Sequence, residues 1–252
     1  MNQSAQAAGL AEPATHIRGF VDVLAERAQW PITNEGGEAA GAYGARRRLP
    51  LPEGPVKLDS VQLETGEEGR LTPAGDEFVL VLAGDIALRQ AGAELKLRAG
   101  GAGVVLRDEA LDWRSEQGAD LIVMSCEAGG GVGAKAPVGI DLAGQLSPSN
   151  PPLPEVLLTP TPQCRSRRDY VSASGEFICG VWDSTAYRRR AFTYGHYELM
   201  HLLDGEVTLV DVDGREGRFQ TGGVALLRQG GASTWEHRGY VRKIYATYKP
   251  TA

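Results

Sequence analysis

Hydrophobic and polar positions along the chain alternate in short runs of strand length. In the first half these runs cover residues 56–63, 77–88, 94–97, 103–106 and 121–124. In the second half they cover residues 177–182, 197–203, 206–212, 217–220, 224–227, 234–237 and 241–248. Glycine, proline or acidic clusters separate the runs, and no long helical period lies between them. The pattern therefore predicts an all-β chain built from sandwiches or barrels.

Two segments lie outside these runs. Residues 15–30 have a weakly amphipathic pattern that predicts a short helix, which Pro31 would end. Residues 128–164 are rich in glycine and proline, which is typical of a linker. We therefore expect an N-terminal arm over 1–45, a first unit over 46–127, a linker over 128–164 and a second unit over 165–252.

The two units are copies of one sequence. Glu77 and Gly84 recur 121 residues later (198 − 77 and 205 − 84) as Glu198 and Gly205. The same offset pairs Arg46 with Arg167, Arg47 with Arg168 and Gly54 with Gly175. Downstream the offset is 122, and it pairs Gly92 with Gly214, Glu94 with Glu216, Gly100 with Gly222, Gly101 with Gly223 and Trp113 with Trp235. The offset changes from 121 to 122 at a predicted hairpin turn. An inserted residue there leaves the inward-facing and outward-facing positions of the strands unchanged. The repeated pattern therefore indicates a duplication.

Composition narrows the classes of partner and the compartment. The net charge of −6 argues against a general nucleic-acid binder, which needs a basic face. Three scattered cysteines without Cys-x-x-Cys spacing fit a reducing compartment. Residues 1–13 lack the features of a signal peptide, and no apolar run is long enough for a membrane span. We expect a cytoplasmic protein with neither nucleic acid nor membrane as its partner.

The second unit resembles the cupins. Glu198, followed by Gly205, Asp213-Gly214, Gly222-Gly223 and Gly230 with Trp235, is similar to the two cupin sequence motifs. Together with residues 179–184, this region resembles the subfamily that includes the cupin domain of ureidoglycine aminohydrolase and bacterial two-cupin proteins of unassigned function. The resemblance covers 165–248 directly and 46–127 through the repeat. It implies two jelly-roll barrels of the RmlC-like superfamily in tandem, and the pairing of two copies into a homodimer through their sheets.

Most of the metal ligands found in metal-binding cupins are missing from this sequence. The family places His-x-His, then Glu, then a later His inside the barrel. Only Glu198 remains here, because Thr193 or Tyr194 and Ser233 stand where histidines are expected. The first unit keeps Glu77 but has no histidine beside it. A metal cofactor is therefore not favoured.

Strand parity identifies candidate site residues without the family. Side chains alternate between the two faces of a strand, so Glu198 shares its face with Tyr194 and His196, whereas His201 falls on the opposite face. We expect His201 to pack against another sheet or subunit. With Glu198 pointing inward, the predicted ligand pocket consists of Tyr194, His196, Glu198, Ser233, Trp235 and His237.

Three functions remain open at this point. In the first, the second barrel binds a small polar or anionic molecule, which the run Arg188-Arg189-Arg190 attracts, and the first barrel is mainly structural. In the second, the chain is a metal-dependent enzyme acting on a small nitrogenous or carboxylate substrate, as ureidoglycine aminohydrolase is. There His196, Glu198 and His237 would hold a divalent transition metal. In the third, neither barrel has a working site and the chain serves in assembly.

Overall fold

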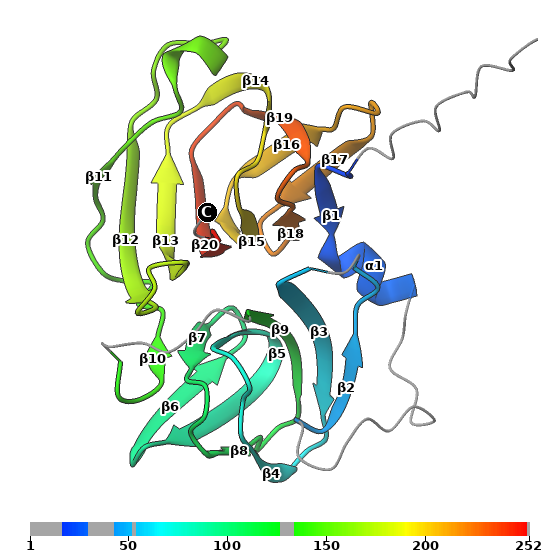
Figure 1. Ribbon diagram of the computed structural model, residues 1–252, viewed down its shortest axis with the longest axis vertical. Coiled ribbons are helices and arrows are strands. Elements are labelled where there is room, and N and C mark those ends of the chain that lie inside the picture. The colour runs from blue at the N-terminus through cyan, green and yellow to red at the C-terminus, as the bar shows by residue number, and fades with distance from the viewer. Residues whose placement is uncertain (1–16, 30–42, 52–53, 127–133, 251–252) are drawn as a thin grey trace, which may run out of the picture.

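A computed structural model describes residues 17–29, 43–51, 54–126 and 134–250. It consists of two β-barrels side by side, with the first in blue-cyan to green and the second in yellow-green to red (Figure 1). The helical elements in the described residues are α1 (Val23–Gln29) and a single 3-10 turn, η1 (Pro154–Val156). Neither has the length and apolar character needed to span a membrane. The predicted all-β fold is confirmed.

The first barrel is a curled sheet with a filled interior. Its strands are β2 (Ala45–Arg48), β3 (Val56–Leu63), β4 (Glu68–Leu71), β5 (Glu77–Gln90), β6 (Ala93–Arg98), β7 (Ala102–Val105), β8 (Leu111–Arg114) and β9 (Ala119–Cys126). The order β7-β5-β9-β3-β2 forms one wall, and the second half of β5 with β6, β8 and β4 forms the other. Val79, Leu88, Leu111 and Leu121 are fully buried between the walls. Apolar side chains thus occupy the inside of this barrel.

The second barrel follows the same plan in two separate sheets. Its strands are β12 (Cys164–Val171), β13 (Phe177–Ser184), β14 (Tyr187–Thr193), β15 (Tyr197–Asp204), β16 (Glu206–Val210), β17 (Glu216–Gln220), β18 (Val224–Leu227), β19 (Ala232–His237) and β20 (Val241–Tyr248). One sheet contains β18-β15-β20-β13-β12 and the other β14-β19-β16-β17. Met200, Leu202 and Val207 point into the space between them.

Strand register confirms the duplication. Glu77 pairs with Val105 on β7 and with Ser125 on β9. Glu198 pairs with residues 227 on β18 and 247 on β20, which lie 122 positions further on (227 − 105 and 247 − 125). Gly84 and Gly205 both have left-handed backbone, with φ of 75° and 85°. The two halves therefore share their register, and not only their sequence pattern.

The arm and the linker each complete one barrel. Strand β1 (Phe20–Asp22) in the arm pairs with β18, and β10 (Val138–Gly139) in the linker pairs with β7. Val21 lies opposite Leu226, and Val138 lies opposite Val104, so the two added strands occupy equivalent edges (226 − 104 = 122). The helix expected over 15–30 is shorter than predicted, because residues 20–22 join the sheet. Trp30 and Pro31 lie outside the described residues.

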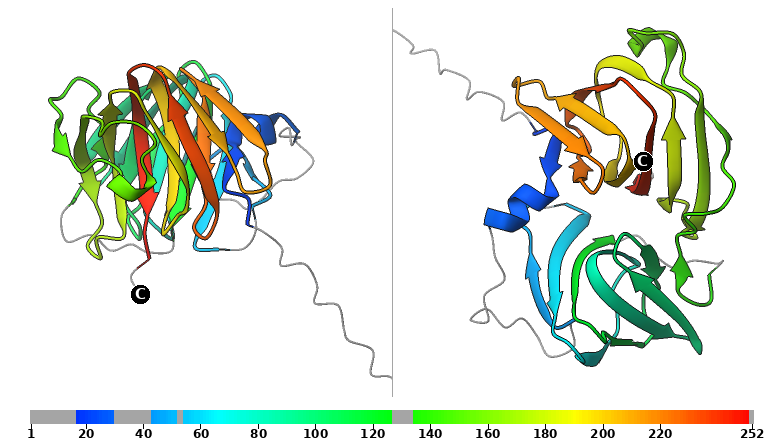
Figure 2. Two further views of the ribbon diagram at one scale, coloured as in Figure 1. Left: turned by 90° about the horizontal axis from the view of Figure 1, so that it is seen from above. Right: turned by 180° about the vertical axis from the view of Figure 1, so that it is seen from behind.

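The larger sheets of the two barrels pack against one another (Figure 2). Their contact is a single apolar cluster that includes Leu58, Phe78 and Ile122 from the first barrel and Leu199, Leu226 and Ile244 from the second. One buried polar contact crosses it, from the Tyr170 hydroxyl to Asp76 Oδ2 at 2.5 Å. Because this apolar surface is removed from water only when both barrels are folded, each barrel stabilises the other.

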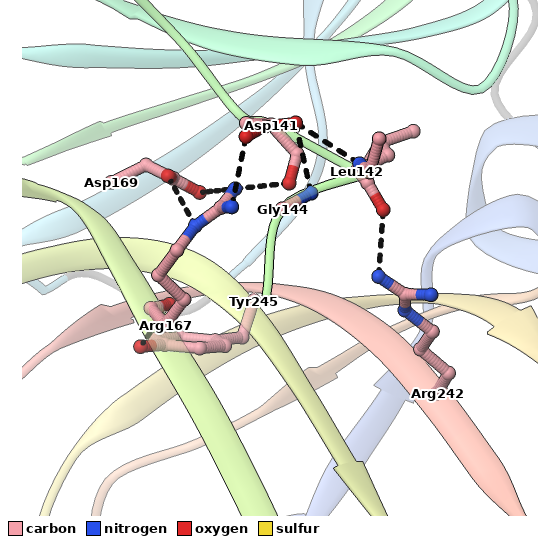
Figure 3. Close-up of polar contacts among 8 residues, drawn as sticks. Asp141, Leu142, Gly144, Arg167, Asp169, Arg242 and Tyr245 are labelled. Carbon is pink, nitrogen blue, oxygen red and sulfur yellow. Dashed lines mark hydrogen bonds and ion pairs between the residues drawn. The ribbon is translucent and has the colours of Figure 1, made fainter. Parts of the chain in front are cut away.

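The linker is tied to the second barrel by arginines (Figure 3). Arg167 Nη1 donates to Asp141 Oδ2 at 2.9 Å, and Arg242 Nη2 donates to the carbonyl of Leu142 at 2.6 Å. Further along, β11 (Ser147–Ser149) pairs with β12. These contacts hold the following residues, 149–156, against the second barrel.

Candidate functional site

The second barrel encloses a cavity of about 580 Å³. Strands β12 to β15 and β18 to β20 line it, and residues 149–153 with Val156 of the linker form one wall. Prolines at 151 and 152 restrict the backbone of that wall, so it is a stiff element rather than a loose loop. The linker therefore contributes to the cavity, in addition to joining the barrels.

Four of the six predicted pocket residues line this cavity: Tyr194, His196, Glu198 and Trp235. The other two are buried behind its wall. The Ser233 hydroxyl hydrogen-bonds the Tyr194 hydroxyl at 2.5 Å, and the His237 ring packs edge-on against Tyr187 at 4.6 Å. His201 lies on the opposite face of β15, in a groove between the two barrels. The expectation that residues 194–200 form one strand is wrong, because β15 begins at Tyr197 and residues 194–196 form the bend between β14 and β15. Tyr194 and His196 reach the cavity from that bend, so strand parity applies to Glu198, Ser233, Trp235 and His237, and it does not tell which of these line the cavity.

Glu198 is an ionised carboxylate within the cavity. Its Oε1 accepts a hydrogen bond from Lys243 Nζ at 2.5 Å, and its Oε2 lies 3.4 Å from His196 Nε2. Burial by itself would raise the pKa of Glu198, but the Lys243 ammonium and the His196 contact outweigh burial and hold the pKa below its usual value. Glu198 therefore acts as a hydrogen-bond acceptor at neutral pH.

Lys243 is a site residue that the repeat could not reveal. Its counterpart in the first barrel is Leu121 (243 − 122), which is apolar. Lys243 Nζ lies 4.8 Å from the ring centroids of both Trp182 and Trp235, so the ammonium is held by two indole faces as well as by Glu198. The alternation along β20 carried the missing signal, since Lys243 shares a face with Tyr245.

The first barrel neutralises its own glutamate from a different strand. Arg46 on β2 donates to Glu77 at 3.1 Å and to Asp59 at 2.6 Å. Arg46 lies opposite Val61, and the residue at the equivalent position of β12 is Ser166, opposite Trp182 (182 − 61 = 121). The predicted match of Arg46 to Arg167 is therefore one residue out of register. Each barrel keeps the glutamate but supplies its cation independently.

Two arginines add positive charge to the cavity. Arg189 is 4% exposed, and its guanidinium donates to the Ser233 carbonyl at 2.8 Å and to the Tyr194 hydroxyl at 3.2 Å. Arg168 on β12 is exposed at the cavity edge, and its side chain forms no hydrogen bond or ion pair with any described residue. Arg188 and Arg190 point to the exterior, so one arginine of the predicted run faces the cavity.

The residues proposed for a metal do not fit one. Among the described residues, no group of three or more His, Cys, Asp or Glu side chains is arranged to hold a metal ion. His237 Nδ1 donates to the Gly239 carbonyl at 2.9 Å, and burial lowers its pKa to about 4, so His237 is a neutral structural group. The Lys243 ammonium already occupies Glu198 Oε1. The Lys243 ammonium therefore takes the Glu198 oxygen that a metal ion would need as a ligand.

Comparisons with known proteins agree with this architecture. Residues 171–245 match the family model of the EutQ-like cupin domain. A crystal structure from Pseudomonas syringae, of a protein of unknown function in the DUF861 family, is 26% identical with a TM-score of 0.75, covering 86% of this chain and 90% of its own. No curated protein sequence matches the chain.

Two more distant structures share the fold. The Escherichia coli protein Ylba is 12% identical with a TM-score of 0.61, covering 96% of this chain and 97% of its own. A cupin 2 conserved barrel domain protein from Leptotrichia buccalis is 12% identical with a TM-score of 0.59, covering 84% and 92%. Residues 171–245 therefore match a cupin domain, and the fold of the chain as a whole is consistent with the RmlC-like cupin superfamily.

Proposed function

We propose that the second barrel binds a small anionic molecule, with the first barrel as its structural partner. The observation that carries this function is the charge of the cavity. Among the described residues that line it, Arg168, Arg189 and Lys243 are cationic, and Glu198 is the one carboxylate. Lys243 and Glu198 balance each other, so two guanidinium groups remain without a counter-charge.

Uncompensated charge in a concave site is a recognition element. The buried walls around Arg189 have a low dielectric constant and strengthen its field, and the exposed Arg168 adds its charge at the edge of the cavity, so anions are concentrated at the opening. A guanidinium group offers paired N–H donors that match the two oxygens of a carboxylate. A small carboxylate therefore complements the cavity in both charge and shape. The filled apolar interior of the first barrel supports its structural role.

A comparison of acids with their amides tests this function. Thermal shift measurements with benzoate, propionate and succinate are compared with benzamide, propionamide and succinamide, because each amide keeps the shape and removes the charge. We expect stabilisation that grows with the concentration of the acids only. The variant Arg168→Gln should weaken carboxylate binding about tenfold, which corresponds to one lost charge-assisted contact.

Arg188→Gln is the matched control, since Arg188 is an exposed arginine of β14 that points away from the cavity. Its carboxylate affinity should equal that of the wild-type protein. Equal stabilisation by acids and amides, or equal loss in the two variants, would contradict the proposed function.

A further inference from the structure

The walls of the cavity indicate the shape of the anion. Six aromatic side chains line the cavity: Trp182, Tyr187, Phe192, Tyr194, Trp235 and Tyr245. Tyr187 and Trp235 are stacked with their planes 13° apart, and Trp182 stands at 90° to Trp235 with 6.3 Å between centroids. These contacts fix the rings against one another. Tyr187, Tyr194 and Trp235 are nearly fully buried, so the aromatic rings that a ligand can reach are those of Trp182, Phe192 and Tyr245.

The volume of the cavity agrees with a ring-sized ligand. A space of about 580 Å³ lies within the range of sites that bury ligands of several rings or of drug size, and it far exceeds what a two-carbon acid fills. Flat apolar walls favour planar π systems, because aromatic groups gain edge-to-face or offset stacking beyond simple burial. A saturated ring of similar size gains burial alone.

The three cationic side chains that line the cavity differ in how many protein groups already bind them. Lys243 is held by Glu198 and two indoles, and Arg189 by Ser233 and Tyr194. Arg168 alone of the three has a side chain without a hydrogen bond or ion pair to the described residues.

Arg168 also lies close to an aromatic wall. It is in register with Gly180, which in turn is in register with Tyr245. The Tyr245 hydroxyl donates to the carbonyl of Arg167, the neighbour of Arg168, at 3.4 Å, and the charge of Arg168 acts on that hydroxyl by lowering its pKa against the larger effect of burial. A carboxylate bound to Arg168 would thus place an attached ring along Tyr245 and Trp182.

On the basis of the proposed function, we infer that the ligand is a planar aromatic carboxylate, with its carboxylate on Arg168 and its ring against Trp182 and Tyr245. The opposite end of the cavity complements a hydrogen-bond donor on that ring, since among the described residues Glu198 Oε2 has only the long contact with His196 at 3.4 Å. The Tyr245 hydroxyl donates to the Arg167 carbonyl at 3.4 Å, so Tyr245 offers the ligand its ring, and its hydroxyl oxygen as an acceptor.

Titration calorimetry on the full chain with benzoate, cyclohexanecarboxylate and propionate tests the inference. The first two have the same charge and nearly the same size, and they differ in planarity. We expect benzoate to bind about tenfold more tightly than cyclohexanecarboxylate, from ring stacking, and propionate to bind about a hundredfold more weakly than benzoate.

The variant Trp182→Leu keeps an apolar wall and removes its π surface. It should bring benzoate and cyclohexanecarboxylate to within about twofold of each other. Tyr240→Leu is the control, because Tyr240 is an exposed aromatic residue of the same barrel outside the cavity, and it should leave both affinities unchanged.

The outcomes separate the inference from the proposed function. Cyclohexanecarboxylate binding as tightly as benzoate, or an unchanged benzoate preference in Trp182→Leu, would overturn the aromatic class while leaving anion binding intact. Failure of all three acids to bind, or equal binding of benzamide and benzoate, would overturn the proposed function itself.

Discussion

Lys243 and Glu198 form an ion pair at 2.5 Å inside the second barrel, on positions that correspond to Leu121 and Glu77 in the first. The glutamate is common to both copies, whereas the lysine belongs to one. In the first barrel Arg46 neutralises Glu77 from another strand, and apolar side chains fill the remaining space. The cavity of the second barrel is therefore the product of divergence after duplication.

Removing the lysine alone should be costly. Lys243→Met leaves the Glu198 carboxylate buried without its cation, which should lower the free energy of unfolding by about 3 to 5 kcal/mol. The double variant Lys243→Met with Glu198→Gln removes both charges and should recover much of that loss. Urea unfolding of the four proteins in a double-mutant cycle measures the coupling. A double variant less stable than the single one by the full cost of Glu198→Gln would show that the pair is not coupled.

Acid should remove the contribution of the Glu198 carboxylate to the free energy of unfolding. Its pKa in the folded protein lies below the unfolded value of 4.5, so this contribution is complete above pH 4.5 and is lost as the pH falls below it toward the folded pKa. The difference in unfolding free energy between the wild-type protein and Glu198→Gln should therefore be constant from pH 7 to 5 and shrink below pH 4.5. Urea titrations across this range measure it, and a difference that widens on acidification would contradict the ion pair.

The duplicated glycines divide into two kinds. At Gly84 and Gly205, φ is positive and an added Cβ would lie 1.8 Å from the Gly118 carbonyl oxygen and 2.3 Å from the Tyr240 carbonyl oxygen. Alanine there should destabilise by about 4 kcal/mol or more. Gly92 and Gly214 have the same backbone, with φ of 79° and 78°, but open space around them.

Alanine at Gly92 or Gly214 should therefore cost only the backbone strain, about 1 to 2 kcal/mol. Thermal unfolding of the four single variants tests the division. Similar melting temperatures for all four would show that the close approach of the backbone at Gly84 and Gly205 is relieved at little cost.

The contact between the barrels should depend on Tyr170. Tyr170→Phe removes the hydroxyl that donates to buried Asp76 and should cost about 1 to 3 kcal/mol, because the carboxylate loses a partner that water cannot replace. Tyr240→Phe is the control, since the Tyr240 hydroxyl also donates to a buried aspartate, Asp183 at 2.8 Å, but Asp183 keeps its two hydrogen bonds from Arg165. Chemical unfolding should show a clearly smaller loss for the control. Equal losses would mean that the Tyr170 hydroxyl contributes no more to Asp76 than the Tyr240 hydroxyl does to Asp183.

The apolar strands could be predicted from the sequence almost to the residue. Strands β18 and β20 begin and end where the apolar pattern predicts: all four residues of β18 are buried, and Val241, Ile244, Ala246 and Tyr248 are buried on β20. Strands β12 and β14 escaped prediction because arginine interrupts their pattern. These two strands supply Arg168 and Arg189. Arginines therefore interrupt the apolar pattern that predicts strands, and they also form the proposed anion-binding site.

Strand parity predicts which face of a strand a side chain lies on, but not whether that side chain reaches the surface of the cavity. It placed Glu198 and Trp235 correctly toward the interior, yet it could not separate them from Ser233 and His237, which share that face and lie behind the cavity wall. The contribution of residues 149–156 depends on how the linker folds back over the barrel. No local pattern encodes that path, because it follows from contacts such as that between Arg242 and Leu142.

Anomalous diffraction from crystals soaked in 4-bromobenzoate shows where an aromatic carboxylate binds, because bromine marks the position of the ligand. We expect one bromine peak inside the second barrel, near Trp182, with the carboxylate on Arg168, and a weaker peak in Arg168→Gln crystals soaked at the same ligand concentration near the wild-type Kd. A peak only in the groove beside His201 or on the outer surface, or no peak at saturating ligand, would contradict this expectation.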